Sequence, residues 1–400
     1  MVSLRRPCSF DRTLDQRMKD IYFDHNATTP VLPGVLAAML PFFEENSGNP
    51  SSGHTAGAKA RTAIERARDQ ISDLVGAAPN NVLFTSSATE AINTALHSAI
   101  HSRGGERSRI VITAVEHAAV QRCAIAAEKG GMEVIQIPVG ASGALALDRL
   151  DDAITAETCV VSVMWANNET GVIFPISQIS ELCADRGVPL HVDAVQAAGK
   201  APIDLRVVPI DYLSISAHKL FGPKGVGALV ASPHLVAPFM LGGNQETGRR
   251  AGTENVPAIV GFGEAARLAA LELKQRSDAV ATLRDRLEQV LFQSIKGCYI
   301  NGLGQPRIPN TSNMGFDGID GDSLAGMLNA SDIYLSTGSA CSANTLTPSH
   351  VIMAMTGSYE RAGEAVRFSL SHLNTDAEVA RTIAVVEQSV ASLRSTQAPV

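Results

Sequence analysis

Short apolar runs alternate with helical patterns along the chain, and this alternation constrains the fold more than any other feature. The runs lie at 82–85, 110–113, 159–166 and 189–192, and helical patterns follow them or lie between them. Parallel strands need crossover connections, which are usually helices. The sequence therefore predicts an α/β fold in which helices cover both faces of a parallel sheet.

Two helical patterns indicate how the chain is organised. Between 54 and 76, Ile64, Ala67, Ile71 and Leu74 follow the three-and-four spacing of an amphipathic helix. Residues 265–295 form one long helical pattern, followed by shorter strands and helices, and we interpret it as the connection to a smaller domain. We expect a large domain at 32–273 and a smaller α+β domain formed by 1–31 and 274–400, so that the start of the chain packs back onto the smaller domain.

Composition and charge exclude several classes of protein. The chain has 400 residues, a net charge of −7 and no block of Lys and Arg, which argues against a nucleic-acid partner. It has no run of eighteen apolar residues and no apolar segment near its start, so we expect a soluble, cytoplasmic protein without a membrane partner. Six widely spaced cysteines without a CxxC pair predict neither a bound metal nor a disulfide framework.

The residues that follow the predicted strands are chemically coherent. Ligands of open parallel sheets bind beyond the carboxyl ends of the strands. Ser87, Ala88 and Thr89 follow the first run at a predicted helix start, where free N–H groups bind phosphate, although simple helix capping is the alternative. His117 follows the second run and is suited to lie over a ring and move protons, or is a surface or capping histidine. The third run ends before Asn167, Asn168 and Glu169, where an Asn pair also suits a turn.

Two further strand ends complete the pattern. Asp193 ends the fourth run, Gln196 follows one helical turn later, and the alternative for Asp193 is a helix cap. A strand at 211–216 ends in Ser216, before His218 and Lys219. A desolvated lysine forms a Schiff base with an aldehyde, although an unselected lysine is usually solvated. Pyridoxal phosphate needs such a lysine, a carboxylate for its ring nitrogen and a phosphate cradle, and this edge supplies all three.

One cysteine lies in an unusual setting. Cys341 stands in "STGSACSANT", residues 336–345, without a large apolar neighbour to bury it. Structural cysteines usually pack among apolar side chains, so we interpret this stretch as an exposed loop that carries a reactive thiol.

The sequence resembles the cysteine desulfurases of the nitrogen-fixation and housekeeping iron–sulfur type, in the class V pyridoxal-phosphate aminotransferase superfamily. The resemblance begins at residue 21 and spans nearly the whole chain. It rests on ordered motifs: "YFDHNATTP", "GNPSSGH", "VSVMWANNETGVIFPI", "HVDAVQAAGK", "SAHKLFGPKG", "GRRAGTENV", "STGSAC" and "AVRFSLS". It implies a fold type I transferase with a mostly parallel, seven-stranded sheet.

Carried onto the matching positions, the resemblance implies a set of cofactor contacts. Lys219 would form the Schiff base, with Asp193 on the ring nitrogen, Gln196 on the phenolic oxygen and His117 stacked on the ring. Phosphate contacts are expected from Ser87, Ala88, Thr89, Ser216 and His218, with Thr253 contributed by the other subunit of a homodimer. Asn168 would lie beside the cofactor and the substrate.

The resemblance also implies the reaction. Arg367 would bind the carboxylate of L-cysteine, with Asn168 and Asn26 beside it, and Cys341 would take the sulfur as a persulfide and leave L-alanine. The sulfur would pass to an iron–sulfur scaffold or another acceptor protein. Two alternatives stay open: a lyase or aminotransferase that does not need Cys341, and a non-catalytic scaffold. Departures from the family pattern at Ala217, Asn244 and Thr247 leave the acceptor open.

Overall fold

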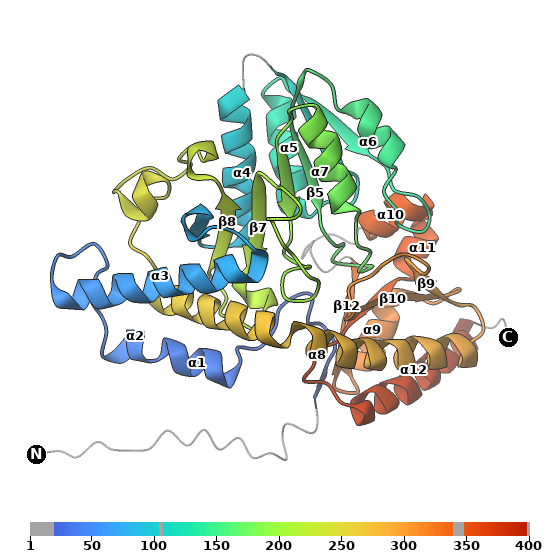
Figure 1. The fold of residues 1–400 in the computed structure, drawn as a ribbon. Helices are drawn as coiled ribbons and strands as arrows, with labels where there is room; N and C mark the ends of the chain where they lie inside the picture. Colours follow the sequence, from blue (N-terminus) through green and yellow to red (C-terminus); the bar gives the residue numbers. More distant parts are fainter. Residues whose placement is uncertain (1–19, 104–106, 339–347, 398–400) are drawn as a thin grey trace, which may run out of the picture.

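A seven-stranded sheet forms the centre of the larger part of the molecule (Figure 1). The computed structural model describes residues 20–103, 107–338 and 348–397. The sheet has the order β2-β8-β7-β6-β5-β3-β4. Its strands are β2 (Val82–Thr85), β3 (Arg109–Thr113), β4 (Glu133–Ile137), β5 (Thr158–Met164), β6 (Leu190–Asp193), β7 (Tyr212–Ser216) and β8 (Gly227–Ala231). The predicted runs are all strands of this sheet, and the α/β fold is confirmed.

One strand breaks the parallel arrangement. Strand β8 is antiparallel to both of its neighbours, β2 and β7, whereas β3 to β7 pair in parallel. The connection between β7 and β8 contains only the short 3₁₀ helix η2 (Ala217–Lys219) and a turn, which is too little chain for a crossover. The chain must therefore return antiparallel, and this hairpin places Lys219 just beyond the carboxyl end of β7.

Successive strand residues enter two separate hydrophobic cores. Leu83 packs into the core beneath α4 and α5, whereas Phe84 packs into the core beneath α3, α7 and α8. This follows from the two-residue period of a strand and explains why the strands read as continuous apolar runs. The helices of this part are α1 (Pro33–Met39), α2 (Pro41–Glu44), α3 (Thr55–Val75), α4 (Ala88–Arg103), α5 (Ala118–Lys129), α6 (Leu147–Ala153) and α7 (Ile176–Asp185). Short 3₁₀ helices are η1 (Pro79–Asn81), η3 (Pro233–Leu235) and η4 (Gln245–Gly248).

The long helix α8 (Val256–Ser294) joins this sheet to a second one, as predicted. Figure 1 shows α8 extending from beside α3 to beside α12. Its first half, including Phe262, packs in the core of the large sheet, and its second half, including Leu287, packs in another hydrophobic cluster. At Gly263 an added Cβ would lie 2.6 Å from the Cα atom of Ala67, so the close contact of α8 with α3 requires glycine.

The second sheet has four antiparallel strands in the order β12-β13-β10-β9. They are β9 (Cys298–Asn301), β10 (Thr311–Phe316), β12 (Ser336–Thr337) and β13 (Val366–Ser369). The helices around it are α9 (Gly321–Asn329), α10 (His350–Thr356), α11 (Tyr359–Gly363) and α12 (Asp376–Gln397). Strand β1 (Ile21–Tyr22) pairs in parallel with β11 (Ile333–Tyr334). Among the described residues, no helix combines the length and apolarity needed to cross a membrane.

Candidate active site

The carboxyl ends of β5, β6 and β7 and the start of α4 surround a cavity of about 390 Å³. Nearly every residue that the sequence predicted for the site lines it: Asn26, Ser87, Ala88, Thr89, His117, Asn168, Asp193, Gln196, Ser216, His218, Lys219 and Arg367. Strand ends of a parallel sheet meet at one edge, which is why positions far apart in the sequence converge here.

Two predicted residues are not among this lining. Thr253 lies in a separate cavity of about 170 Å³, together with Glu246 and Arg250. Cys341 lies outside the described residues. The roles predicted for both residues therefore stay predictions.

Lys219 is the last residue of η2 and enters the cavity from the end of β7. Its Nζ atom donates hydrogen bonds to the main-chain oxygens of Asn26 and Ala27, the latter at 2.7 Å. The residue is half-buried, and the backbone just after it turns sharply at Phe221, which has a φ of 64°. The main-chain N–H of Phe221 donates to Oγ1 of Thr29 at 2.9 Å, which holds this turn in place.

The pKa values of Asp193, which is buried, and His117, which is partly buried, shift in opposite directions. Asp193 is 6% exposed, and its Oδ1 accepts from the N–H of Val195 at 3.0 Å. Burial raises the pKa of Asp193 and lowers that of His117, and the two groups partly stabilise each other's charge. Nδ1 of His117 accepts from the N–H of Ala119 at 3.1 Å, so a neutral ring carries its proton on Nε2. His117 is thus a helix cap that also lines the cavity.

The predicted phosphate cradle lies at the start of α4, which lines the cavity. Oγ of Ser87 accepts from the N–H of Glu90 at 3.3 Å, and the Glu90 carboxylate accepts from the N–H of Ser86 at 2.7 Å. This reciprocal capping confirms the capping interpretation and fixes the first turn. Strand β8 approaches closely, because a Cβ at Gly227 would lie 2.5 Å from the carbonyl carbon of Ser87.

Ser216 and His218 flank the same region from β7 and η2. Ser216 is 3% exposed, and Nδ1 of His218 lies 3.1 Å from Oγ1 of Thr28. Burial, together with the nearby positive charge of Lys219, lowers the pKa of His218 to about 4. His218 is therefore neutral at pH 7 and can donate or accept a hydrogen bond without adding charge.

All the hydrogen-bonding groups of the Asn26 side chain have partners within the protein. Its Nδ2 donates to the main-chain oxygen of Asn168 at 3.1 Å and to Oγ1 of Thr311 at 2.8 Å. Its Oδ1 accepts from Nζ of Lys200 at 3.2 Å and from Nδ2 of Asn310 at 2.9 Å. These contacts use the full hydrogen-bonding capacity of the amide, so a direct contact with substrate would require one of them to break. The predicted substrate contact stays a prediction.

Arg367 lies on β13 and reaches the cavity from the second sheet. It is 4% exposed. Its Nη2 donates to Oδ1 of Asp24 at 2.7 Å, and its Nη1 donates to the main-chain oxygen of Asn168 at 3.1 Å. Its Nε is buried without a hydrogen-bond partner in the described part of the chain. A buried, unsatisfied donor on a guanidinium that lines a cavity favours an anionic ligand there.

Three other polar residues near the strand ends are not part of the cavity lining. Asn167 shapes a turn, because its Oδ1 accepts from the N–H groups of Glu169 and Thr170 at 2.9 Å each. Glu116 is fully buried, and Glu169 is buried and accepts from Oγ of Ser349. The turn interpretation is confirmed for Asn167, whereas Asn168 lines the cavity. Gln196 follows Asp193 in a run of turns, so the alternative interpretation of Asp193 as a helix cap is wrong.

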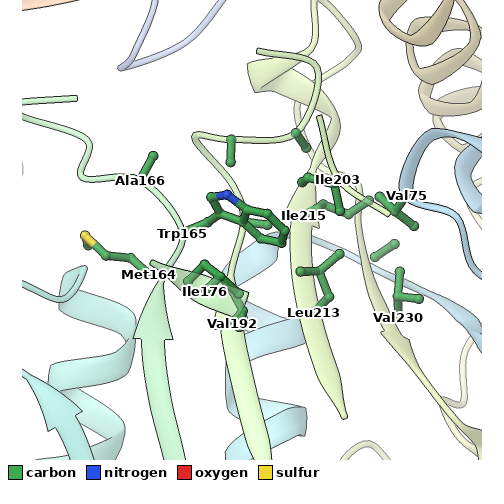
Figure 2. Packing of buried hydrophobic residues seen from close by; sticks show 14 of the residues in the cluster. Val75, Met164, Trp165, Ala166, Ile176, Val192, Ile203, Leu213, Ile215 and Val230 are labelled. Carbon is green, nitrogen blue, oxygen red and sulfur yellow. The ribbon is translucent and has the colours of Figure 1, made fainter. Parts of the chain in front are cut away.

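Sequence reasoning missed the apolar lining of the site. Met164, Trp165 and Ala166 all pack in the hydrophobic core, and Met164 and Ala166 also line the cavity, whereas Trp165 between them is not part of that lining. Figure 2 shows the Trp165 ring among Ile176 and neighbouring strand residues, with Met164 pointing the other way. The period-two alternation of a strand that continues past its end would have predicted this split.

The chemistry of the donor set fits pyridoxal 5'-phosphate. A buried carboxylate such as Asp193, with one described hydrogen bond, needs a further donor, and a protonated ring nitrogen provides one. The start of α4 offers main-chain N–H groups for a phosphate, and Lys219 offers an amine. A larger cavity of about 670 Å³ lies at the opposite edge of the sheet, near Asp211 and Tyr212, and lacks such a combination.

Comparison with known proteins supports the same family. The aminotransferase class-V family model matches residues 21–382. A cysteine desulfurase of Gluconacetobacter diazotrophicus is 45% identical over 380 residues, covering 94% of this chain and 95% of that protein. The cysteine desulfurase NifS of Azotobacter vinelandii is 43% identical over 380 residues, covering 94% of both.

Solved structures agree with the sequence comparison. A NifS-like protein superposes with a TM-score of 0.88 at 35% identity, covering 94% of this chain and 100% of that one. The structure of SspA in complex with cysteine gives a TM-score of 0.78 at 31% identity, covering 89% and 100%. Because sequence and shape agree over nearly the full length, the chain belongs to the aminotransferase class-V family and, within it, to the cysteine desulfurases.

Proposed function

We propose that this chain is a pyridoxal-phosphate-dependent cysteine desulfurase that converts L-cysteine to L-alanine and keeps the sulfur as a persulfide on Cys341. The observation that carries the proposal is the single cavity lined by Lys219, Asp193, the start of α4 and Arg367. Related proteins are cysteine desulfurases, and SspA was solved in complex with cysteine.

The cofactor contacts follow from the positions of the lining residues. Lys219 would hold the cofactor covalently, and the start of α4, with Ser87, Ala88, Thr89, Ser216 and His218, would hold its phosphate. His117 would stack on the ring, with Gln196 on the phenolic oxygen. The bound cofactor supplies an acceptor for the electrons released when the Cα–H bond breaks.

The chain's own residues then perform the proton and sulfur transfers. Arg367 would bind the substrate carboxylate, and the carboxylate of Asp193 would hold a proton at the ring nitrogen. Nζ of Lys219 would remove the proton from Cα, and His117 would move the proton of the substrate thiol. The Cys341 thiolate would attack the substrate sulfur, forming an S–S bond as the C–S bond breaks. The electron pair of the C–S bond would stay on the substrate carbons, Cβ would take up a proton, and the proton held by Lys219 would return to Cα to complete alanine.

The other cysteines in the described part of the chain are poor nucleophiles. Burial raises the pKa of Cys123 and Cys159 to about 11 and that of Cys183 and Cys298 to about 12. At neutral pH these four groups are thiols rather than thiolates, and the thiolate is the attacking form. This leaves Cys8 and Cys341 as candidates for the sulfur carrier, and the resemblance to the family favours Cys341.

The test uses L-cysteine carrying radiolabelled sulfur and the chain reconstituted with cofactor. We expect alanine to form and labelled sulfur to stay on the protein in a form that a thiol reductant releases. Cys341→Ala should lose the label, whereas Cys123→Ala should keep it. Full alanine and sulfide production by Cys341→Ala without added thiol would contradict the persulfide and favour a direct lyase. A visible cofactor band that survives in Lys219→Ala would contradict the role of that lysine.

A homodimer would complete the phosphate site. Thr253 lies in a cavity separate from that of its own Lys219, so we propose that it serves the partner subunit. Mixing Lys219→Ala with Thr253→Ala chains should then restore one complete site in each mixed dimer and recover tight cofactor binding. No recovery on mixing, or a monomer by light scattering, would contradict this role.

The destination of the sulfur and the domain boundaries stay proposals. We propose an iron–sulfur scaffold or another sulfur-acceptor protein as the recipient, and label transfer to purified candidates would test it. We also propose the division into a large domain at 32–273 and a small one from 1–31 and 274–400. Limited proteolysis that cuts outside the boundary regions would argue against that division.

A further inference from the structure

Lys200 is a partly buried lysine beside the cavity, and the reaction does not use its amine. It follows β6 in the same run of turns as Gln196. Its Nζ donates to Oε1 of Gln196 at 2.7 Å and to Oδ1 of Asn26 at 3.2 Å. Within the described residues it forms no salt bridge with a carboxylate, which is unusual for a lysine in the interior.

The surroundings of Lys200 favour the uncharged amine. Burial lowers its pKa well below the usual value, and the positive charges of Lys219 and Arg367 lower it further. A neutral amine has two N–H groups, and these match the two amide oxygens that Lys200 contacts. A third proton would find no described acceptor, so the contact pattern agrees with a hydrogen-bonding role rather than a charge-pairing one.

The contacts of Gln196 fix which way its amide faces. Its Oε1 accepts from Lys200, and its Nε2 donates to the main-chain oxygen of Asn26 at 3.0 Å. A flipped amide would place Oε1 against that oxygen, and two acceptors cannot bond. Lys200 would then lose its acceptor as well. The orientation is therefore set by a donor, Lys200, beside Oε1 and an acceptor, the main-chain oxygen of Asn26, beside Nε2.

The fixed orientation leaves an N–H group for a ligand. Nε2 carries two N–H groups, and the described contact with Asn26 uses one of them. Gln196 lines the same cavity as Lys219 and Asp193. The second N–H is thus available to an oxygen of a molecule bound there, whereas the carbonyl oxygen accepts from Lys200.

We propose that Lys200 is a positioning residue, which locks the Gln196 amide so that it presents an N–H donor to the phenolic oxygen of the cofactor. The inference rests on the proposed function, because it assumes that the cofactor occupies this cavity. A fixed donor stabilises the anionic form of that oxygen and so lowers the pH at which it loses its proton.

The test is a pH titration of the visible absorbance of the reconstituted protein. Lys200→Met removes the amine and keeps an unbranched apolar stem, and Lys129→Met at the exposed end of α5 is the matched control. We expect the midpoint to rise by about one pH unit in Lys200→Met, since loss of an aligned donor to a charged group shifts such an equilibrium roughly tenfold. The control should titrate like the wild type.

A double-variant comparison separates positioning from general stability. In a Gln196→Leu background, Lys200→Met should cause no further shift of the midpoint, because the amide through which it acts is gone. An unchanged midpoint in Lys200→Met, or the same shift with and without Gln196, would overturn the inference. Should Lys200→Met fail to fold, Lys200→Gln, whose shorter stem holds its donor away from Gln196, undergoes the same titration with the same expected rise.

The wild-type chain separates this inference from the proposed function. If the reconstituted wild type shows no visible band, the proposed function fails, and this inference fails with it. A normal wild-type band whose midpoint does not depend on Lys200 overturns this inference alone.

Discussion

Replacing Glu116 by glutamine should flatten the pH dependence of the protein's stability. Glu116 has no exposed surface, and its Oε1 accepts from Oγ1 of Thr113 at 2.6 Å and from the N–H of Met164 at 2.9 Å. Its Oε2 is buried without a partner in the described part of the chain. Burial, with a contribution from the charge of Asp193, raises the pKa of Glu116 from 4.5 to about 8.

The sign of the effect follows from proton binding. Between pH 4.5 and about 8 the folded chain keeps a proton on Glu116 that the unfolded chain releases, so raising the pH favours unfolding. The contribution of Glu116 to the free energy of unfolding is therefore fully present at low pH and is lost as the pH rises through the pKa of the folded state. The full difference corresponds to roughly 5 kcal/mol above that pKa, and about 2–3 kcal/mol of it falls between pH 6 and pH 9.

Urea unfolding at pH 6 and pH 9 measures this loss. The wild type should lose about 2–3 kcal/mol more unfolding free energy between the two pH values than Glu116→Gln does. The glutamine side chain can change the unfolding free energy itself, but because it does not titrate, that change is the same at both pH values and cancels in the comparison. Glu128→Gln, at an exposed position of α5, should follow the wild type. The same loss in Glu116→Gln and the wild type would refute the reasoning.

Three other substitutions test the Arg68–Glu246 ion pair that holds the 245–248 segment, the proposed phosphate cradle and the proposed substrate contact. Glu246→Ala removes the buried partner of the Arg68 guanidinium, which is 7% exposed and 2.8 Å away, and leaves only the exposed Glu65 paired with it, so it should lower the unfolding free energy by about 3 kcal/mol in urea. Asp278→Ala, in an exposed pair, should cost less than about 1 kcal/mol, and equal losses would contradict this. Gly227→Ala should weaken cofactor binding about tenfold in a reconstitution titration, because its Cβ would lie 2.5 Å from the backbone at the start of α4; unchanged affinity would argue against the cradle. Arg367→Lys should raise KM for cysteine roughly 10- to 100-fold with the cofactor band intact, since lysine lacks the planar fork; an unchanged KM would exclude this contact.

The residues of the candidate site were predictable because each belongs to a local pattern. Lys219, Asp193 and the start of α4 each follow a recognisable strand, and parallel strands end at a common edge. No knowledge of packing was needed to bring them together. The resemblance to cysteine desulfurases then assigned roles to these positions, and the comparisons confirmed the family.

Contacts between distant segments could not be predicted in this way. The ion pair of Arg367 with Asp24 joins residues 343 positions apart, and the amine of Lys200 is set by Asn26 and Gln196 from different segments. Strand β8 runs antiparallel because the hairpin after β7 is short. Such features depend on which surfaces meet in the folded chain, and burial, not residue type, sets their pKa values and partners.

The sequence by itself determined the sheet, the edge at which ligands bind and the chemical groups available there. Only the tertiary structure decided which of those groups are saturated, such as Asn26, and which have donors to spare, such as Arg367. The physical reason is that local patterns fix backbone geometry, whereas hydrogen-bond partners and desolvation arise only when separate elements pack.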